Sequence, residues 1–575
     1  MKDKLRAMLR GKTWSSFWQE TRWIYRYVRS YRRSICLFLL LSLLSIGLGL
    51  GTTLASKAFF DLIAGHLQGA SVENQAIVTT GALCVSLAVC NIALSAVNKW
   101  WTAKISTTVA NEIRADVYQK ILMTDLESLQ AFHSGDLLNR VNNDVSEVAS
   151  SVLGWIPSLI TRSVQFLASL VVILVYDPTM AILALLGAPV TLLVSQTLMK
   201  KMRTHQLNLR QVTSRSMALH EESLQNVQHI KALNLQGIFY RRILGVQKDF
   251  FDATMQYQRF SILTSLLMSG MGLIVSYACL GWAAYRMWIG AISFGTMVLF
   301  LQVSSYLSSA FSALVGLVPS AISATVSARR LMSVLELPRE DEAEAGAAQH
   351  LCGQPLTLVL DKLQFSYQNG TPILQLLSLT VHPGERIAFV GRSGSGKTTL
   401  FRVMLGLLHP QQGRAVVQCG ERELKLSAST RCLFAYVPQD CLMFSGTIAE
   451  SLRLVRPDAT DEALWNVLET ACAAEFVRKL PEGLNSTLRE RGSSLSGGQV
   501  QRLVLARALL TEAPILLLDE VTAALDLETE RQVLANISRA YAGRILLIAT
   551  HRPSALALCD RIYRFEDGML KEDKA

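Results

Sequence analysis

The chain has 575 residues and a formal net charge of +11, with 50% hydrophobic and only 18% charged residues. Together with a positive mean hydropathy, this balance excludes an ordinary soluble protein and indicates a membrane part joined to a soluble part. The ten cysteines are scattered and form no C-x-x-C pair, so neither a zinc site nor a disulfide framework is indicated. We interpret the cysteines as reduced packing residues.

Residues 1–33 form a segment in which basic and aromatic side chains alternate directly before a long apolar run. This arrangement favours an interfacial helix on anionic lipid over stacking on single-stranded nucleic acid, so we expect no nucleic-acid partner. A cleavable signal peptide is disfavoured, because the apolar run exceeds a typical signal core. The residues that make the pattern are Lys2, Lys4, Arg6, Arg10, Lys12, Trp14, Trp18, Arg22, Trp23, Tyr25, Arg26, Tyr27, Arg29, Tyr31, Arg32 and Arg33.

Residues 34–335 are predicted to form a transmembrane domain with six apolar spans, each long enough to cross the hydrocarbon core of a bilayer. The loop at 66–75 holds no Lys or Arg, whereas Lys104, Arg114, Lys120 and Arg140 follow the second span. The positive-inside rule therefore places that segment and both termini in the cytoplasm. The spans cover about 35–63, 77–101, 152–176, 180–198, 261–285 and 291–324, with a tight turn at Asp177 and Pro178.

Two segments, one after the second span and one after the fourth, are too long to be turns. In the first, Ile113, Val117 and Ile121 recur every four positions, which indicates a helix. We expect membrane helices that extend into the cytoplasm and contact another domain at their ends. The alternative is a pair of solvated amphipathic hairpins.

Several polar side chains interrupt the apolar spans. Intramembrane ionisable groups are costly and are functional candidates by default, so Arg162 is a candidate contact for an anionic substrate. Snorkelling or pairing within the bundle is an equal alternative, and the serines are equally compatible with helix packing through small residues. The polar residues are Asn91, Arg162, Gln165, Gln302, Ser304, Ser305, Tyr306, Ser308 and Ser309.

Residues 336–355 are predicted to be a linker, because a helix continuing from the sixth span meets Pro338 and an acidic, alanine-rich run follows at 340–348. From residue 356 to residue 575, short β-like runs alternate with helical segments. This alternation predicts an α/β domain.

Residues 391–398 match the phosphate-binding loop G-x-x-x-x-G-K-[ST]. A buried strand is predicted before the loop, at 386–390, and a helix after it, which is the context in which backbone N–H groups close around phosphate oxygens. Lys397 is expected to reach the β- and γ-phosphates, and Thr398 to hold Mg²⁺. The expected nucleotide contacts of this segment are Gly391, Ser393, Gly394, Gly396, Lys397, Thr398 and Thr399.

The run 515–520 is predicted to be a buried strand that ends in two carboxylates. Asp519 is expected to bind Mg²⁺, and Glu520 is expected to polarise the water that attacks the γ-phosphorus. An apolar run that ends in Asp-Glu is weak evidence by itself, but it becomes strong when it follows a phosphate loop at this separation.

Residues 495–499, between these two motifs, read LSGGQ. With this motif the sequence closely resembles the ATP-binding cassette family. The resemblance implies that the motif binds the γ-phosphate held on an opposite cassette, through the serine hydroxyl and glycine amides at a helix N-terminus. Two chains are then needed for a complete site. The residues concerned are Ser496, Gly497, Gly498 and Gln499.

Other positions match the pattern of this family one at a time. The resemblance implies that Tyr367 stacks on adenine, that Gln439 contacts Mg²⁺ and the attacking water, and that His551 contacts the γ-phosphate. It also implies that Asp526 takes part in communication across the dimer. A tyrosine in the core of a strand and a structural histidine are the alternatives for Tyr367 and His551.

Two positions depart from the family pattern. Arg489 stands where exporter-type members usually have a glycine before the Glu490-Arg491-Gly492 loop, which contacts the partner's cytoplasmic loops in those members. Ala523 stands where the family commonly has a serine. The contacts of the loop and the tuning of dimer communication are therefore expected to differ from the family pattern.

The membrane half also resembles exporters, with six spans ahead of the cassette and matching segments at 135–140 and 221–231. The resemblance covers nearly the whole chain and implies a half-transporter, with a polytopic α-helical membrane domain followed by an α/β P-loop ATPase domain. Since the cassette residues are all of the competent type, a homodimer is favoured over a pair with a related half-transporter.

The resemblance implies an ATP-driven transporter with alternating access, which uses ATP and Mg²⁺. We expect it to export amphipathic drugs, lipids or peptides across a lipid bilayer. An importer built on the same fold, as in siderophore uptake, and a membrane-anchored regulatory ATPase or gated channel are the alternatives. The expected location is the bacterial inner membrane, with both termini in the cytoplasm.

Overall fold

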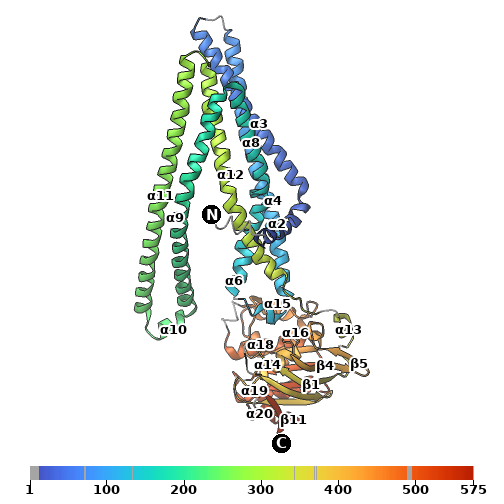
Figure 1. Ribbon diagram of the computed structural model, residues 1–575. Helices are drawn as coiled ribbons and strands as arrows, with labels where there is room; N and C mark the ends of the chain where they lie inside the picture. Colours follow the sequence, from blue (N-terminus) through green and yellow to red (C-terminus); the bar gives the residue numbers. More distant parts are fainter. Residues whose placement is uncertain are drawn as a thin grey trace. The chain divides into compact units, whose positions relative to one another are not determined.

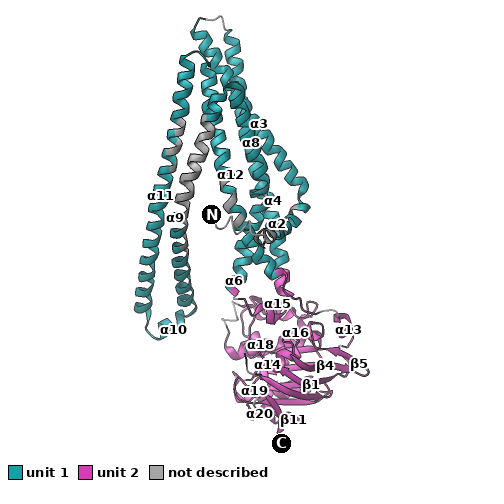
Figure 2. Ribbon diagram, viewed as in Figure 1, with its two compact units in different colours: residues 1–118, 135–334 teal, residues 119–134, 335–575 magenta. Residues whose placement is uncertain are grey.

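The computed structural model describes residues 12–573 apart from short gaps, and it divides into two compact units (Figure 2). The first unit contains residues 1–118 and 135–334, and the second contains residues 119–134 and 335–575. The predictions on the basic residues before Lys12, on residues 489–492 and on Ala523 lie outside the described residues. The gaps are 70–72, 133, 342–343, 352, 368–369, 371, 489–494, 523 and 567.

The first unit is built from helices that follow the apolar runs of the sequence (Figure 1). In the described part of the chain, four segments are long and apolar enough to cross a membrane: 32–67, 74–122, 134–176 and 294–314. The predicted fourth and fifth spans include residues whose side chains are not described, so the six-span count stays a prediction. The helices are α2 (Lys12–Ser30), α3 (Arg32–Leu67), α4 (Asn74–Leu122), α6 (Ser134–Asn139), the π-helical turn η1 (Arg140–Asp144), α7 (Val145–Gly154), α8 (Ile156–Tyr176), α9 (Pro178–Gln225), α10 (Val227–Ala232), α11 (Gln236–Trp288) and α12 (Phe294–Leu335).

The long segments after the second and fourth predicted spans are helical, as the sequence predicted. α4 continues beyond the second span as one helix, and Ile113 and Val117 on it are fully buried. α9 and α11 run side by side and are joined at one end by the short α10 (Figure 1).

The predicted tight turn at Asp177 and Pro178 separates α8 from α9. The Asp177 carboxylate accepts a hydrogen bond from the Thr179 N–H at 2.9 Å, and Pro178 occupies the first turn of α9, where a helix needs no N–H. Asp177 is 1% exposed, and its charge is compensated by Arg286 of α11 at 2.8 Å. The cap and the ion pair fix this turn against α11.

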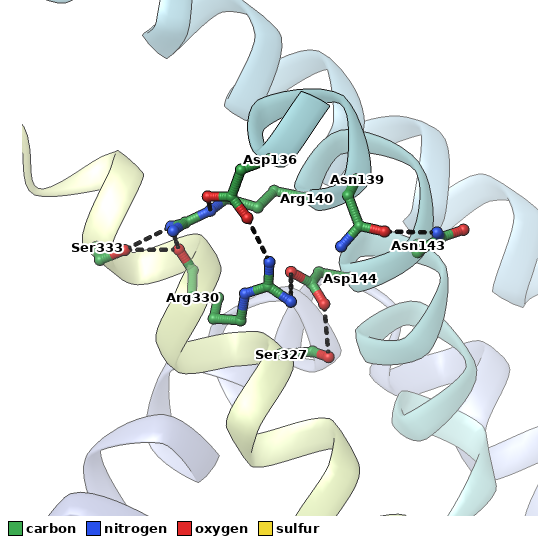
Figure 3. Close-up of polar contacts among 8 residues, drawn as sticks. All are labelled: Asp136, Asn139, Arg140, Asn143, Asp144, Ser327, Arg330 and Ser333. Carbon is green, nitrogen blue, oxygen red and sulfur yellow. Dashed lines mark hydrogen bonds and ion pairs between the residues drawn. The ribbon is translucent and has the colours of Figure 1, made fainter. Parts of the chain in front are cut away.

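A polar cluster joins the segment after α6 to the end of α12 (Figure 3). Arg330 of α12 pairs with Asp136 at 2.6 Å and with the buried Asp144 at 3.3 Å, and Ser327 donates a hydrogen bond to Asp144 at 2.9 Å. Arg140 pairs with the other oxygen of Asp136 at 2.8 Å and donates to the Arg330 carbonyl at 2.6 Å. Two arginines thus share one carboxylate, which ties α6 and the π-helical turn to α12.

The second unit contains the α/β pattern that the sequence predicted. Its larger sheet has the strand order β12-β11-β3-β10-β9-β6, in which all neighbours are parallel except the edge strand β12. Its smaller sheet is antiparallel, with the order β2-β1-β4-β5, and a short pair joins β7 (Gly446–Thr447) to β8 (Thr487–Leu488). The strands are β1 (Thr357–Phe365), β2 (Leu374–Val381), β3 (Arg386–Val390), β4 (Gln412–Cys419), β5 (Arg422–Lys425), β6 (Phe434–Val437), β9 (Ile515–Asp519), β10 (Ile545–Ala549), β11 (Arg561–Glu566) and β12 (Met569–Asp573).

Two hydrophobic clusters hold this unit together, and β9 and β10 contribute to both, because alternate residues of a strand point to opposite faces. Both strands are buried at every position, as expected for central parallel strands covered on two sides. The carboxyl ends of β3, β9 and β10 therefore lie together at one edge of the sheet. The helices are α5 (Leu126–Leu129), α13 (Ala345–Gln349), α14 (Lys397–Met404), α15 (Ile448–Arg453), α16 (Asp461–Thr470), α17 (Ala474–Arg478), α18 (Gly497–Leu510), α19 (Leu527–Ala540) and α20 (Pro553–Leu556), with short 3₁₀ turns at Ala428–Leu433 and Gly483–Asn485.

Residues 119–134, in the long segment that follows the second predicted span, belong to this second unit. The Asp125 carboxylate lies 3.6 Å from His409, and Lys120 donates a hydrogen bond to the Leu337 carbonyl. The predicted linker is docked as well: Glu340 forms two hydrogen bonds of 2.7 Å with the Arg431 guanidinium. The prediction that such a segment contacts another domain is confirmed for this one, and the domain boundaries given above stay predictions.

Candidate functional site

The phosphate loop connects β3 to α14, as the sequence predicted. Gly394 and Gly396 have φ angles of 80° and 111°, a conformation that only glycine adopts without strain. At Gly391 the backbone runs so close to its neighbours that a Cβ would lie 2.8 Å from the Phe565 Cβ and from the Ser395 hydroxyl. The glycines are therefore required by the path of the loop, which opens directly into the N-terminus of a helix.

Lys397, the first residue of α14, is 6% exposed and folds back over the loop. Its ammonium group donates hydrogen bonds to the carbonyls of Gly391 at 2.6 Å and Arg392 at 3.2 Å. Burial lowers the pKa of this ammonium group, against the opposing effect of the Glu520 and Asp519 charges. A buried cation whose two closest acceptor contacts on the loop are neutral carbonyls is well placed to bind phosphate oxygens instead.

Asp519, the last residue of β9, is 1% exposed, and its Oδ2 atom has no hydrogen-bond partner among the described residues. Burial raises the pKa of the Asp519 carboxyl, although a hydrogen bond from Thr398 acts in the opposite direction. A buried carboxylate oxygen without a partner next to a threonine hydroxyl is a donor set that suits a hard cation such as Mg²⁺. The predicted metal residues Asp519 and Thr398 therefore do come together.

Glu520 follows β9 and has a φ angle of 53°, the left-handed conformation that is uncommon for a residue with a side chain. Its Oε2 atom accepts a hydrogen bond from the Gln439 side chain at 3.0 Å. Its Oε1 atom lies 3.9 Å from the His551 Nε2 atom and 4.0 Å from the Lys397 ammonium. His551 in turn lies 3.2 Å from that ammonium, so the structure brings the four predicted residues into one cluster at the carboxyl edge of the sheet.

Tyr367 lies after β1 and is half-buried. Its ring packs edge-on against Phe365, with 5.1 Å between the centroids, and its hydroxyl lies 3.5 Å from the Arg402 guanidinium. The ring thus packs against the core while the residue keeps some exposure. Thr399 is 8% exposed in the first turn of α14, whereas Ser393 is exposed.

The LSGGQ segment begins α18. Ser496 caps this helix through a reciprocal pair of hydrogen bonds with Gln499, at 3.3 Å and 2.9 Å. Ser496 and Gly497 are exposed, and Gly498 cannot carry a side chain freely, because a Cβ there would lie 3.0 Å from the Ala524 carbonyl. No described hydrogen bond joins this segment to residues 391–398 of the same chain.

Asp526 caps α19, accepting a hydrogen bond from the Thr529 N–H at 3.0 Å. That hydrogen bond holds the pKa of the exposed Asp526 carboxyl below its usual range. In this chain the residue is an ordinary helix cap, and its proposed part in dimer communication requires a second chain.

Sequence reasoning missed one support of the site. Arg552, next to His551, donates hydrogen bonds to the fully buried Glu530 at 2.8 Å and to the Leu525 carbonyl at 3.0 Å. These contacts anchor the backbone that carries His551 to α19 and its preceding loop. The position of Arg552 next to the predicted histidine was the one sequence feature that pointed to this support. Glu530, with which Arg552 pairs, lies 22 residues away in the chain.

Two family models match the chain. Residues 35–311 match the ABC transporter transmembrane region, and residues 374–523 match the ABC transporter model. A multidrug resistance ABC transporter ATP-binding and permease protein from Lactococcus lactis subsp. lactis is 28% identical over 85% of this chain and 82% of its own length. A fatty acid ABC transporter ATP-binding/permease protein from Mycobacterium tuberculosis is 27% identical over 90% and 82%.

Among solved structures, a bacterial Atm1-family ABC exporter with ATP bound matches with a TM-score of 0.79 and 21% identity, covering 94% of this chain and 95% of that one. The fold and the site define a phosphate-loop ATPase fused to a helical membrane domain. The chain belongs to the ATP-binding cassette transporter family, and it is a half-transporter that couples ATP hydrolysis to transport.

Proposed function

We propose that two copies of this chain form an exporter of amphipathic molecules, with ATP bound at two sites between their ATPase domains. The proposal rests on the N-terminus of α18, which is formed by the cap Ser496 and the glycines that follow it. Ser496 and Gly497 are exposed, and no described hydrogen bond joins them to the phosphate loop of the same chain. A helix N-terminus of this kind binds an anion well. A second chain supplies the phosphate that this terminus lacks.

Each nucleotide site is proposed to take Tyr367, the phosphate loop, Gln439, Glu520 and His551 from one chain. Ser496, Gly497, Gly498, Gln499 and Asp526 come from the other chain. Because one sequence holds both halves, two identical chains make two complete sites. A homodimer therefore needs no further subunit for activity.

In each site the Lys397 ammonium exchanges its two carbonyl partners for the β- and γ-phosphate oxygens. Thr398, Asp519 and Gln439 are the residues that would hold Mg²⁺, which supplies charge neutralisation at these phosphates when bound. Glu520 accepts the proton of the attacking water, and the hydrogen bond from Gln439 keeps its carboxylate in position. His551, held by the anchored Arg552 backbone, contacts the γ-phosphate.

The proposed cargo is amphipathic because relatives of this chain carry names that specify multidrug resistance and fatty acid transport. The membrane is proposed to be the bacterial inner membrane, with both termini in the cytoplasm. ATP binding draws the ATPase domains together, and hydrolysis separates them, so that the membrane helices alternate between inward and outward access.

The test uses two inactive variants of the full chain, Lys397→Ala and Ser496→Ala, which carry different affinity tags and are co-expressed. If each site combines residues of two chains, a mixed dimer has one site with both defects and one intact site. Mixed dimers purified through both tags should then recover up to about half of the wild-type ATPase activity in liposomes, as expected for one working site of two. Activity no higher than that of either variant alone would contradict the composite site.

Direction is measured in vesicles whose ATPase domains face outwards. ATP-dependent accumulation of a fluorescent amphiphile inside these vesicles is expected of an exporter. ATP-dependent loss of preloaded amphiphile would instead indicate an importer.

A further inference from the structure

A cavity of about 350 Å³ lies within the first unit between α3, α4 and α8, with Tyr306 of α12 at its wall. The segments that contain these helices are apolar and long enough to cross a membrane. Eleven of the fifteen residues that line the cavity are nevertheless polar. Polar residues of three apolar segments are therefore gathered around one cavity, which makes it a candidate ligand site.

Arg162 is the one charged residue among those that line the cavity. Asp177 marks the turn that ends α8, and Arg162 lies fifteen residues before it. The rise of an α-helix places Arg162 about 22 Å from that turn. That distance is within the roughly 30 Å thickness of the hydrocarbon core. The guanidinium group of the exposed Arg162 donates to the neutral Gln165 side chain at 2.8 Å, and no carboxylate among the described residues pairs with it, so a positive charge lies at the cavity wall.

At Asn91, a hydrogen bond occupies the acceptor atom of the side chain and leaves its donor available. The Asn91 side-chain oxygen already accepts a hydrogen bond from Ser45 at 2.7 Å, which directs its NH₂ group elsewhere. The Asn91 NH₂ nitrogen and the Tyr306 hydroxyl both lie 3.8 Å from the point where a Cβ of Gly49 would stand. The missing side chain of Gly49 thus opens a space beside two hydrogen-bond donors.

Ser169 lines the same cavity, is 0% exposed, and has a hydroxyl group without a hydrogen-bond partner among the described residues. The Asn98 side-chain oxygen is likewise buried without a partner, although its NH₂ group donates to Ser42 at 2.8 Å. An unpaired buried polar group costs free energy that a ligand or water in the cavity recovers.

We propose that this cavity binds the anionic head group, a carboxylate or a phosphate, of the exported amphiphile, with Arg162 as its counter-cation and Asn91, Tyr306 and Ser169 as hydrogen-bond donors. Its volume is within the range of ligand sites and holds such a head group with the first part of its chain. The inference rests on the proposed export function and specifies the charge class of the cargo.

The test measures equilibrium binding without ATP, using the full chain in nanodiscs of zwitterionic lipid and subtracting the signal of empty nanodiscs. The ligands are octanoate, octyl phosphate, octyltrimethylammonium and octanol, which share one alkyl chain and differ in the head group. Both anions are expected to bind more tightly than the cation and the alcohol, and the tighter of the two anions identifies the head group.

Arg162→Gln should weaken anion binding by about tenfold or more, the usual effect of losing a charge-assisted hydrogen bond. Arg162→Lys keeps the charge and should recover part of this loss. Gly49→Leu fills the cavity and should abolish anion binding without changing any charge. The matched control is Arg259→Gln, which removes an exposed arginine from α11 and should leave binding unchanged.

Equal binding of the cation and the anions, or full anion affinity in both Arg162→Gln and Gly49→Leu, would overturn the proposal. ATP hydrolysis and vesicle transport are measured separately on the wild-type chain. If transport fails while anions bind with the predicted dependence on Arg162, the export function is wrong and the anion site stands. If transport succeeds without that dependence, the anion site alone is wrong.

Discussion

Replacing Glu520 with glutamine separates nucleotide binding from hydrolysis. The side chain keeps its shape, and an amide oxygen at this position still accepts the hydrogen bond that the Gln439 side chain donates at 3.0 Å. The backbone φ angle of 53° disfavours glutamate and glutamine alike, so Glu520→Gln adds no strain. The change therefore removes one property, the ability to accept a proton from water.

General-base catalysis contributes about 100- to 10,000-fold to the rate of such a reaction, which corresponds to about 3–5 kcal/mol of transition-state stabilisation. We therefore expect Glu520→Gln to lower kcat for ATP hydrolysis in liposomes by about 100- to 10,000-fold. ATP affinity should be equal or higher, because the negative charge that leaves lies 4.0 Å from the Lys397 ammonium that binds phosphate. Steady-state ATPase assays and binding of a fluorescent ATP analogue measure the two quantities.

The matched control is Glu512→Gln. Glu512 has nearly the same φ angle, 54°, but it is exposed and pairs with Arg456 at 2.7 Å on the surface, where such pairs contribute little. The control should hydrolyse ATP at the wild-type rate. A loss of less than about tenfold in Glu520→Gln would be too small for a general base and would refute its assigned role.

Asp519→Asn removes a buried carboxylate with an oxygen that no described residue pairs with, so it should raise the melting temperature of the nucleotide-free chain in thermal unfolding. The same change should abolish Mg²⁺-dependent ATP hydrolysis in an ATPase assay. Arg330→Gln leaves Asp144, 6% exposed, without its cation and should cost about 1–3 kcal/mol. Its melting temperature should fall and partly recover when Asp144→Asn is added. Burial alone would raise the pKa of the Asp136 carboxyl, but the hydrogen bonds and charges of Arg140 and Arg330 outweigh it and lower the pKa below the usual 3.8. The stability difference between wild type and Asp136→Asn should therefore be constant at neutral pH and shrink only as the pH falls below about 4.

The nucleotide site was largely predictable because its motifs are short and local. A phosphate loop specifies its own strand, turn and helix, and the strand that ends at Asp519 brings its carboxyl end to the same edge of the sheet, with β10 between it and β3. The sequence could not reveal that Glu520 adopts a positive φ angle, because residue type does not determine that backbone geometry. The spacing of Ser496 and Gln499, by contrast, is the sequence signature of the capping box that the structure contains.

The membrane unit was predictable in its helices but not in its contacts. Apolar runs predict long helices, whereas the pairing of Asp136 with Arg330 joins residues 194 positions apart. Nothing in the local pattern of either segment selects the other as its partner. The cavity could not be predicted for the same reason. Asn91 and Arg162 lie on different helices, and packing rather than the sequence pattern sets how each helix is rotated.

Each of the two units contains a buried side-chain oxygen that a ligand could pair with. Asp519 in the ATPase and Ser169 in the membrane domain are fully or almost fully buried, and each has a side-chain oxygen that no described residue pairs with. Each such atom costs about 1–3 kcal/mol until a ligand pairs it. A ligand that binds there stabilises the conformation in which the atom is buried and leaves other conformations unaffected. A nucleotide, and the proposed cargo in the membrane domain, each shift the conformational equilibrium by the difference between their affinities for its states, while ATP hydrolysis supplies the free energy of transport.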